Sequence, residues 1–237
     1  MKRVYRQTGV RREAGGFVVL LDDSVLRSPG RRALCLPTEP MARAIASEWD
    51  GQGEELDTTS LRLTKLAGRA VDMDAAERAQ AEATVAAYVE TDLVSHRAEG
   101  PPDLVADQVA AWDPLLEWAM QAFSKAPRIT VGILPAPNDA SMAACYADIV
   151  AGFDLYELVS LQALTSVTGS LVIALAVFKQ ELDADRAWGV SQIDETYRMS
   201  RCGDDPEAAD SRAIRREDLN AAVRLLELNR ALKPVIG

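Results

Sequence analysis

The chain has few of the side chains that most enzymes use for catalysis. Its 237 residues include a single histidine, His96. Schemes that pair a serine or cysteine nucleophile with a histidine base must therefore pass through this one residue. We expect a helix over about 75–96, which places His96 one turn after Asp92, and an ordinary helix-surface pair is the simpler interpretation of that spacing. A hydrolase that uses His96 or an acidic pair is kept as the alternative reading.

Cysteine is equally scarce, and its placement excludes two further classes of protein. The three cysteines, Cys35, Cys145 and Cys202, are far apart and odd in number. This pattern fits neither a disulfide framework nor a zinc ligand set. We expect a reducing, cytoplasmic compartment, and the first residues lack the apolar stretch of a secretory signal.

Phosphate-binding loops and metal motifs are also lacking. Gly51-Gln52-Gly53 has no third glycine and no preceding strand, so it is not a dinucleotide-binding turn. None of the acidic pairs has the spacing of a calcium loop, and each suits the end of a helix, where a carboxylate accepts hydrogen bonds from free N–H groups. The sequence therefore predicts no cofactor, no metal and no small-molecule substrate. The pairs in question are Asp72/Asp74, Asp183/Asp185 and Asp204/Asp205.

Positive charge is in deficit, and the net charge of −10 is unevenly distributed. Residues 1–40 hold eight Lys and Arg against four Asp and Glu, whereas residues 72–118 hold eleven acidic residues and two basic ones. An acidic field of this kind repels nucleic acid and anionic lipid. The acidic surface either binds a basic surface of a partner or simply keeps the protein soluble, and the sequence favours neither interpretation over the other.

One uncharged stretch is long enough to raise the question of a membrane span. No charged residue occurs over 158–178, and 171–178 is continuously apolar. Serine, threonine and glutamine dilute its first half, and no aromatic belt flanks it. We expect a buried core helix and no membrane insertion.

The pattern along the chain predicts an α+β fold with the two classes segregated. A small antiparallel β-meander is expected from strands over 16–21, 25–26 and 33–36, with a further strand at Val4-Tyr5. A helix then begins near Pro40 and ends at Gly51. The connector at 54–60 marks a boundary between a β-rich domain, 1–58, which ends in one helix, and an all-α domain, 59–237.

The second domain reads as a series of helices. Asp154 and Glu157 have the spacing of a capping box, which opens a long apolar helix. Asp113-Pro114 is expected to kink or restart another helix. A brief extended piece is expected at 129–133. The remaining helices are expected at about 62–72, 75–96, 139–151, 183–201 and 207–231.

The expected helix over 183–201 carries two stripes. Ala187, Val190, Ile193 and Tyr197 form one apolar face at helical spacing, and a second stripe lies roughly opposite. Tryptophan and methionine around a carboxylate are favoured at protein interfaces, but a helix buried on two sides explains the pattern equally well. The second stripe consists of Trp188, Gln192, Glu195 and Met199.

Short motifs across nearly the whole chain resemble one known family. The chain is similar to the F1-ATPase assembly chaperones that bind the α subunit of ATP synthase, found in mitochondria and α-proteobacteria. The order and coverage of the motifs carry the resemblance. They are Leu34-Cys35-Leu36-Pro37-Thr38, Ala46-Ser47-Glu48-Trp49-Asp50-Gly51-Gln52, Thr91-Asp92-Leu93-Val94, Gln108 with Trp112-Asp113-Pro114-Leu115-Leu116, Gly169-Ser170-Leu171 and Asp194-Glu195-Thr196-Tyr197.

The resemblance implies a β-rich N-terminal and a helical C-terminal domain, no reaction and no cofactor. It implies that the chain holds an unassembled α subunit until its β neighbour arrives. It also associates Glu195 with function and Trp49 with structural integrity; Trp188, Gln192 and Met199 are our further candidates for partner binding. The chain departs from the family pattern at His96 and Cys202. We expect this chain to be a bacterial, cytoplasmic member of the family. A third hypothesis for its function is a structural subunit that stays permanently inside a complex.

Overall fold

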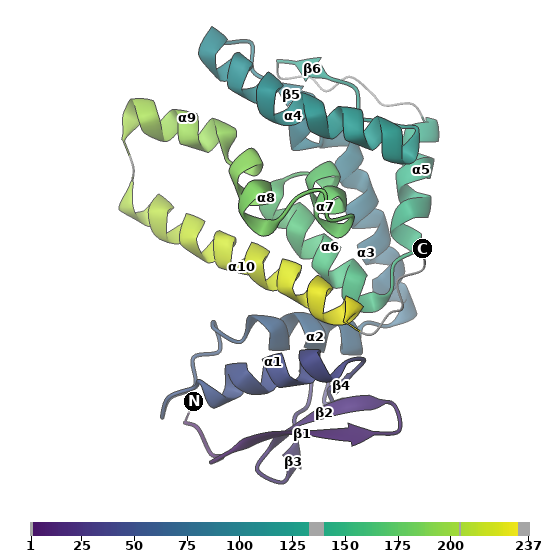
Figure 1. The fold of residues 1–237 in the computed structure, drawn as a ribbon, viewed down its shortest axis with the longest axis vertical. Coiled ribbons are helices and arrows are strands. Elements are labelled where there is room, and N and C mark those ends of the chain that lie inside the picture. Colours follow the sequence, from purple (N-terminus) through teal and green to yellow (C-terminus); the bar gives the residue numbers. More distant parts are fainter. Residues whose placement is uncertain (1, 133–139, 204, 232–237) are drawn as a thin grey trace. The chain divides into compact units, whose positions relative to one another are not determined.

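The computed structural model describes residues 2–132, 140–203 and 205–231. It confirms the α+β class, with a small antiparallel sheet near the N-terminus followed by helices (Figure 1). The chain divides into two compact units, which are described separately below. The first comprises Met1–Arg78, Asp154–Ser160 and Ala221–Gly237, and the second Ala79–Phe153 and Leu161–Asn220. These units are defined by contacts, so the domain boundary at residues 58/59 stays a prediction.

The sheet of the first unit is centred on β2 (Gly16–Leu21). Strand β1 (Thr8–Glu13) pairs with it antiparallel, so that Val10 lies opposite Val19. Both β3 (Ser24–Val25) and β4 (Cys35–Leu36) also pair with β2. The expected meander is therefore wrong in its last step, because β4 returns to β2 instead of continuing from β3.

Strand β1 was not foreseen from the sequence. Its second half is charged and exposed, which hides the alternation typical of a half-buried strand. Charged side chains of this kind are common on edge strands, where they oppose pairing with other chains. The strand expected at Val4-Tyr5 is absent from the described structure; close to it along the chain, Lys2 makes an isolated bridge to Glu55.

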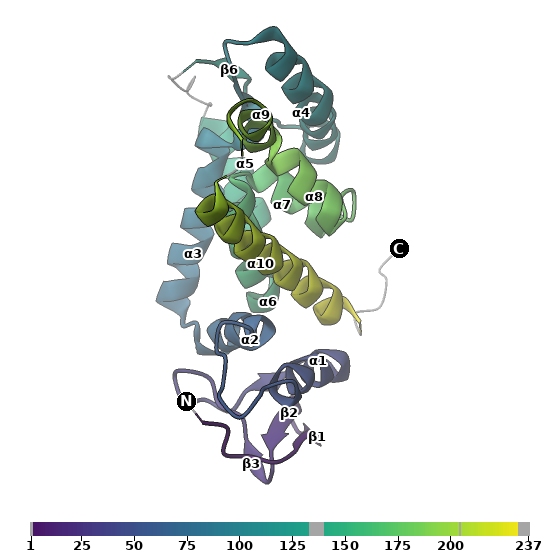
Figure 2. The ribbon, with the colours of Figure 1, turned by 90° about the vertical axis from the view of Figure 1, so that its left-hand side faces the viewer.

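Helix α1 (Glu39–Asp50) covers one face of this sheet (Figures 1 and 2). Met41 and Ile45 are fully buried in a core that also contains residues from β2, β4 and the last turns of α10. Trp49 lies half-buried at the edge of this core. Its indole N–H donates to Thr64 Oγ1 over 3.1 Å, and its ring meets Tyr5 edge to face. Its assignment as a structural residue stays a prediction.

Helix α2 (Arg62–Asp72) is capped by a residue from another helix. The residue at its N-terminus, Leu61, supplies no side-chain hydrogen bond. Glu48 of α1 accepts hydrogen bonds from the main-chain N–H groups of Leu63 and Thr64, at 2.7 and 2.9 Å. A distant carboxylate thus satisfies the free N–H groups that a local serine or aspartate usually serves.

The remaining helices follow in chain order, and the second unit contains most of them. They are α3 (Ala75–Ala87), α4 (Pro102–Phe123), α5 (Ala140–Ala151), α6 (Leu155–Thr168), α7 (Leu171–Phe178), α8 (Ala184–Ser191), α9 (Ile193–Cys202) and α10 (Pro206–Arg230). Two short 3-10 turns, Tyr88–Thr91 and Leu93–Ser95, follow α3. A two-stranded parallel ladder joins β5 (His96–Arg97) to β6 (Thr130–Val131), so the extended piece expected at 129–133 is confirmed in part.

Several expected helices differ from those observed. The capping box is confirmed, since Asp154 and Glu157 exchange reciprocal bonds of 2.9 and 2.8 Å at the start of α6. The long apolar helix is nevertheless two helices, because Gly169 adopts a φ of +70° and Ser170 caps α7. Helix α4 continues through Pro114 without restarting. No helix among the described residues is long and apolar enough to cross a membrane.

Thr38 provides a test of the packing in the first unit. Its hydroxyl accepts from Met41 N–H and donates to Leu228 O over 2.8 Å, in buried surroundings. We expect Thr38→Val to lower the free energy of unfolding by about 1–3 kcal/mol, because two buried groups lose their partner. The matched substitution at the exposed Thr58, Thr58→Val, is expected to change it by less than about 0.5 kcal/mol. Urea unfolding compares the two, and equal effects would contradict the assignment.

Candidate functional site

Glu195 lies on a helix that buries none of its residues. All the described side chains of α9 are exposed or half-buried. The carboxylate of Glu195 forms ion pairs with Arg198 on the same helix, at 2.6 Å, and with Arg212 on α10, at 3.2 Å. Its side chain keeps 31% of its surface exposed. The site is therefore a surface carboxylate placed between two arginines.

The electrostatics of Glu195 follow from these two arginines. The hydrogen bond from Arg198, together with the positive charges of Arg198 and Arg212, lowers the pKa of Glu195 below its ordinary value. The carboxylate is consequently ionised at neutral pH and can accept hydrogen bonds from a cationic group of a partner.

The four predicted partner-binding residues do not all lie on one helix. The expected single helix over 183–201 is wrong, because the backbone breaks at Gln192 between α8 and α9. Trp188 lies half-buried on α8, and Met199 lies half-buried on α9 with Glu195. Gln192 is buried, and its Oε1 has no hydrogen-bond partner among the described residues. The role of the four residues in partner binding stays a prediction.

Helix α9 lies beside α4 (Figure 2). Tyr197 Oη donates to Asp103 Oδ1 over 2.9 Å, and Arg201 forms an ion pair with the same carboxylate. The hydrogen bond from Tyr197 is the main cause that lowers the pKa of Asp103. Sequence reasoning missed Asp103 and Arg212, because both lie far along the chain from the residues they bind and no local spacing signals the pairing.

His96 does not form the expected pair with the Asp92 carboxylate. Helix α3 ends at Ala87, and His96 stands on β5, where its Nδ1 lies 3.1 Å from the main-chain oxygen of Asp92. The Asp92 carboxylate instead accepts from the N–H groups of Val94 and Val172, at 3.2 and 3.0 Å. It is fully buried, and this burial raises its pKa to about 6.

The acidic pairs serve structural roles. Asp74 and Asp183 cap α3 and α8, as expected. Asp185 forms an ion pair with α10 at 2.7 Å. Asp72 caps no helix; it accepts hydrogen bonds from Ser28 and Gly30 in the turn between β3 and β4. Each of these carboxylates is thus engaged in holding the fold.

Two further observations bear on chemistry. Asp204 falls outside the described residues, and Asp205 directly precedes α10. Within the described part of the chain, no group of three or more His, Cys, Asp or Glu side chains is placed to hold a metal ion.

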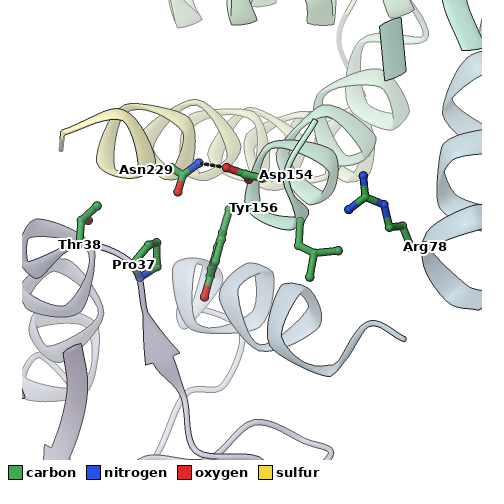
Figure 3. A pocket seen from close by; sticks show the side chains of 7 residues that line it. Pro37, Thr38, Arg78, Asp154, Tyr156 and Asn229 are labelled. Atoms are coloured by element: carbon green, nitrogen blue, oxygen red, sulfur yellow. Dashed lines mark hydrogen bonds between the residues drawn. The ribbon is translucent and has the colours of Figure 1, made fainter. Parts of the chain in front are cut away.

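The first unit contains an open cavity of about 460 Å³, shown in Figure 3. Four of its polar side chains, those of Thr38, Asp154, Tyr156 and Asn229, are engaged in hydrogen bonds within the unit. Asn229 Nδ2 donates to Asp154 Oδ2 over 2.9 Å, and Tyr156 Oη donates to Cys35 O over 3.0 Å. The hydroxyl of Thr38 in its wall donates to Leu228 O. The cavity wall is thereby held together by its own polar groups.

Comparison with known proteins identifies the family. The model of the ATP12 chaperone proteins matches residues 2–120. The chain belongs to the ATP12 chaperone family. The crystal structure of Atp12 from Paracoccus denitrificans is similar, with 37% identity over 97% of this chain and 98% of that one, and a TM-score of 0.90.

Two further relatives agree with this assignment. The Atu1473 protein of Agrobacterium tumefaciens shares 31% identity over 96% of this chain and 85% of its own, with a TM-score of 0.90. Mitochondrial atp12 of Schizosaccharomyces pombe is 23% identical over 92% of this chain and 78% of its own length. Membership of the ATP12 family confirms the resemblance found in the sequence. It supports a chaperone in F1-ATPase assembly and gives no support to the hydrolase alternative.

The buried carboxylate of Asp92 makes a pH-dependent contribution to stability. Its pKa rises from 3.8 to about 6 on folding, so the contribution is fully present below about pH 4 and is lost as pH rises through 6. An asparagine at this position does not titrate. We expect the free energy of unfolding of the wild-type chain to fall by about 3 kcal/mol more than that of Asp92→Asn between pH 4 and pH 7.5. Urea unfolding at a series of pH values measures the difference. Parallel curves would show that the N–H donors offset the burial.

Proposed function

We propose that the chain is a chaperone that binds the unassembled F1 α subunit and prevents its aggregation until it meets the β subunit. Membership of the ATP12 family is the observation that carries this proposal. An unassembled subunit exposes apolar surface that its partner later covers, and patches of this kind promote aggregation. A protein that covers the patch temporarily performs the required task without any reaction, nucleic acid or cofactor.

Glu195 and Met199 on α9, together with Trp188 on the preceding helix α8, are called the α9 surface here, and this surface has the composition that the task needs. Half-buried Met199 lies one turn after the ionised Glu195 on α9 and offers apolar contact area beside it, and half-buried Trp188 on α8 is a further apolar candidate. Gln192 belongs beneath this surface, at the break between the two helices. Because α9 buries none of its residues, its outer face is open to a client.

The ion pairs of Glu195 suit a contact that must form and then release. Arg198 is an exposed partner three residues along the same helix, with 48% of its side chain accessible. Such surface pairs contribute only about 1 kcal/mol or less, so a lysine or arginine of the client can replace Arg198 at small cost. The net charge of −10 favours approach of a basic client surface.

We also propose that the chain is a bacterial protein that acts in the cytoplasm. The identity is 37% and 31% to the two bacterial proteins and 23% to the mitochondrial one from yeast. The three cysteines are all unpaired, which suits a reducing compartment.

The client is tested by capture from a cell lysate. Tagged chain is expected to retain free F1 α subunit and neither free β subunit nor assembled ATP synthase, because the masked surface is accessible only before assembly. Quantitative immunoblotting of the eluate measures the three species. Capture of β alone would overturn the choice of client, and retention of the assembled enzyme would favour a permanent subunit.

Charge reversal tests the α9 surface. We expect Glu195→Lys to weaken binding of the α subunit about tenfold or more, because the client meets a repelling charge, while the melting temperature changes by only a few degrees. Glu117→Lys, on the exposed face of α4, is the matched control and is expected to bind normally. Isothermal titration and thermal melts measure both properties.

A charge swap separates client contact from the local ion pair. Glu195→Lys combined with Arg212→Glu restores an ion pair between the two positions with opposite sign. If the client reads the carboxylate at residue 195, binding stays weak in the double variant. Full recovery of binding would assign Glu195 to the ion pair alone.

A further inference from the structure

The break between α8 and α9 is held on both sides by one helix. Trp112 of α4 donates its indole N–H to the main-chain oxygen of Val190, two residues before Gln192, over 2.7 Å. Gln108 of α4 donates from Nε2 to Asp194 Oδ1, two residues after Gln192, over 2.6 Å. Gln108 and Trp112 are four residues apart, so they lie on the same face of α4.

The bond from Trp112 accounts for the break in the helix. In an uninterrupted helix the oxygen of Val190 accepts from the N–H of Asp194, four residues on. Here the indole of Trp112 takes that place, and a side chain inserted into the helical hydrogen-bond ladder is a known cause of kinks. The N–H of Gln192 turns back to Gly189 O over 3.2 Å, a tighter pattern that ends α8.

Gln108 and Trp112 are themselves held in place by contacts with Arg97 and Ala98. The guanidinium of Arg97 lies 5.0 Å from the Trp112 ring centre, and its Nη1 donates to Gln108 O over 2.7 Å. Its Nη2 pairs with Asp113 at 2.7 Å. The main-chain N–H of Ala98 donates to Gln108 Oε1 over 2.9 Å, which fixes the orientation of the amide. The donor side chains of Gln108 and Trp112 therefore have little conformational freedom.

We propose that Gln108 and Trp112 are positioning residues that set the angle between α8 and α9 and thereby aim the carboxylate of Glu195 at the client. The aiming rests on the proposed function, whereas the control of the bend does not. Both side chains are buried, with 1% and 0% of their surface exposed, so neither can touch a client directly. Their effect on binding must act through α9.

The bend is measured first, without any client. Spin labels are placed on Cys202 and on a cysteine introduced in place of Arg186, in a chain whose Cys35 and Cys145 are replaced by serine. A straight helix would separate the two Cα atoms by about 24 Å, and a bend shortens this distance. In Trp112→Phe and in Gln108→Leu, we expect the distance distribution to broaden and to shift toward longer values. An unchanged distribution in both variants overturns the proposal.

A matched control comes from the same helix. Trp118 contacts Phe123 edge to face, and its indole donates no hydrogen bond to any described residue. Trp118→Phe therefore makes the same chemical change on α4 without releasing the break, and we expect an unchanged distribution. If Trp112→Phe fails to fold, Gln108→Leu gives the decision by itself.

Binding of the F1 α subunit is measured second. We expect Trp112→Phe and Gln108→Leu to raise Kd about tenfold, with Trp118→Phe at the wild-type value. Two variants at Asp194 separate the hydrogen bond from the charge. Asp194→Asn loses the charge but keeps an acceptor oxygen for Gln108, and we expect it to bind the α subunit well. Asp194→Leu loses both the charge and the acceptor oxygen, and we expect it to bind the α subunit poorly.

The outcomes distinguish this proposal from the proposed function. If the wild-type chain binds no α subunit, the choice of client fails, and the spin-label distances still decide whether Gln108 and Trp112 control the bend. If the bend changes in the variants and Kd does not, the aiming of Glu195 is overturned. Equal loss of binding in Asp194→Asn and Asp194→Leu also overturns it, because the charge alone then explains the effect.

Discussion

The oxygen of Val190 takes its hydrogen bond from the indole of Trp112, and the break between α8 and α9 depends on that bond. A buried carbonyl must have a partner, and a helix normally supplies one from its own next turn. When the partner comes from another helix, the chain is free to change direction, and α9 leaves the line of α8. Arg97 supports this break by binding the main-chain oxygen of Gln108 and the carboxylate of Asp113. We infer that the position of Glu195 at the surface depends on which group satisfies the carbonyl of Val190.

The same solution recurs elsewhere in the chain. Helix α2 receives its N-terminal cap from Glu48 of α1, and Asp92 accepts hydrogen bonds from the first N–H groups of α7. A carboxylate that serves a distant helix end both stabilises that end and fixes the distance between two elements. For Asp92 the cost is visible in its raised pKa, because burial opposes the charge that the N–H groups require. Glu48 and Asp92 thus each use a carboxylate to fix one element of the fold against another.

In the proposed mode of client binding, a firm base carries a surface that engages reversibly. The base is the well-packed corner between α4, α8 and α9 in the second unit, where tryptophan and glutamine side chains are fully enclosed. The surface is a helix that buries none of its own residues and carries an ionised carboxylate between two arginines. Exposed ion pairs exchange partners at small cost, so recognition can rely on charge and release remains possible. A firm base and an exchangeable surface are the two properties that the proposed temporary holding of a client requires.

The sequence by itself determined the α+β class, most helix ranges and the capping box at Asp154, because these depend on residues within a few positions of each other. The sequence also determined the family, because the order of its motifs along the chain can be recognised without knowing which residues are in contact. Only the tertiary structure decided that β4 pairs with β2, that Asp92 faces α7 instead of His96, and that the helix over 183–201 bends at Gln192. The partner of Glu195 on α10 was hidden for the same reason, because Arg212 is seventeen residues away. In each case the deciding hydrogen bond joins residues that are distant along the chain, and local periodicity carries no information about which of them will meet.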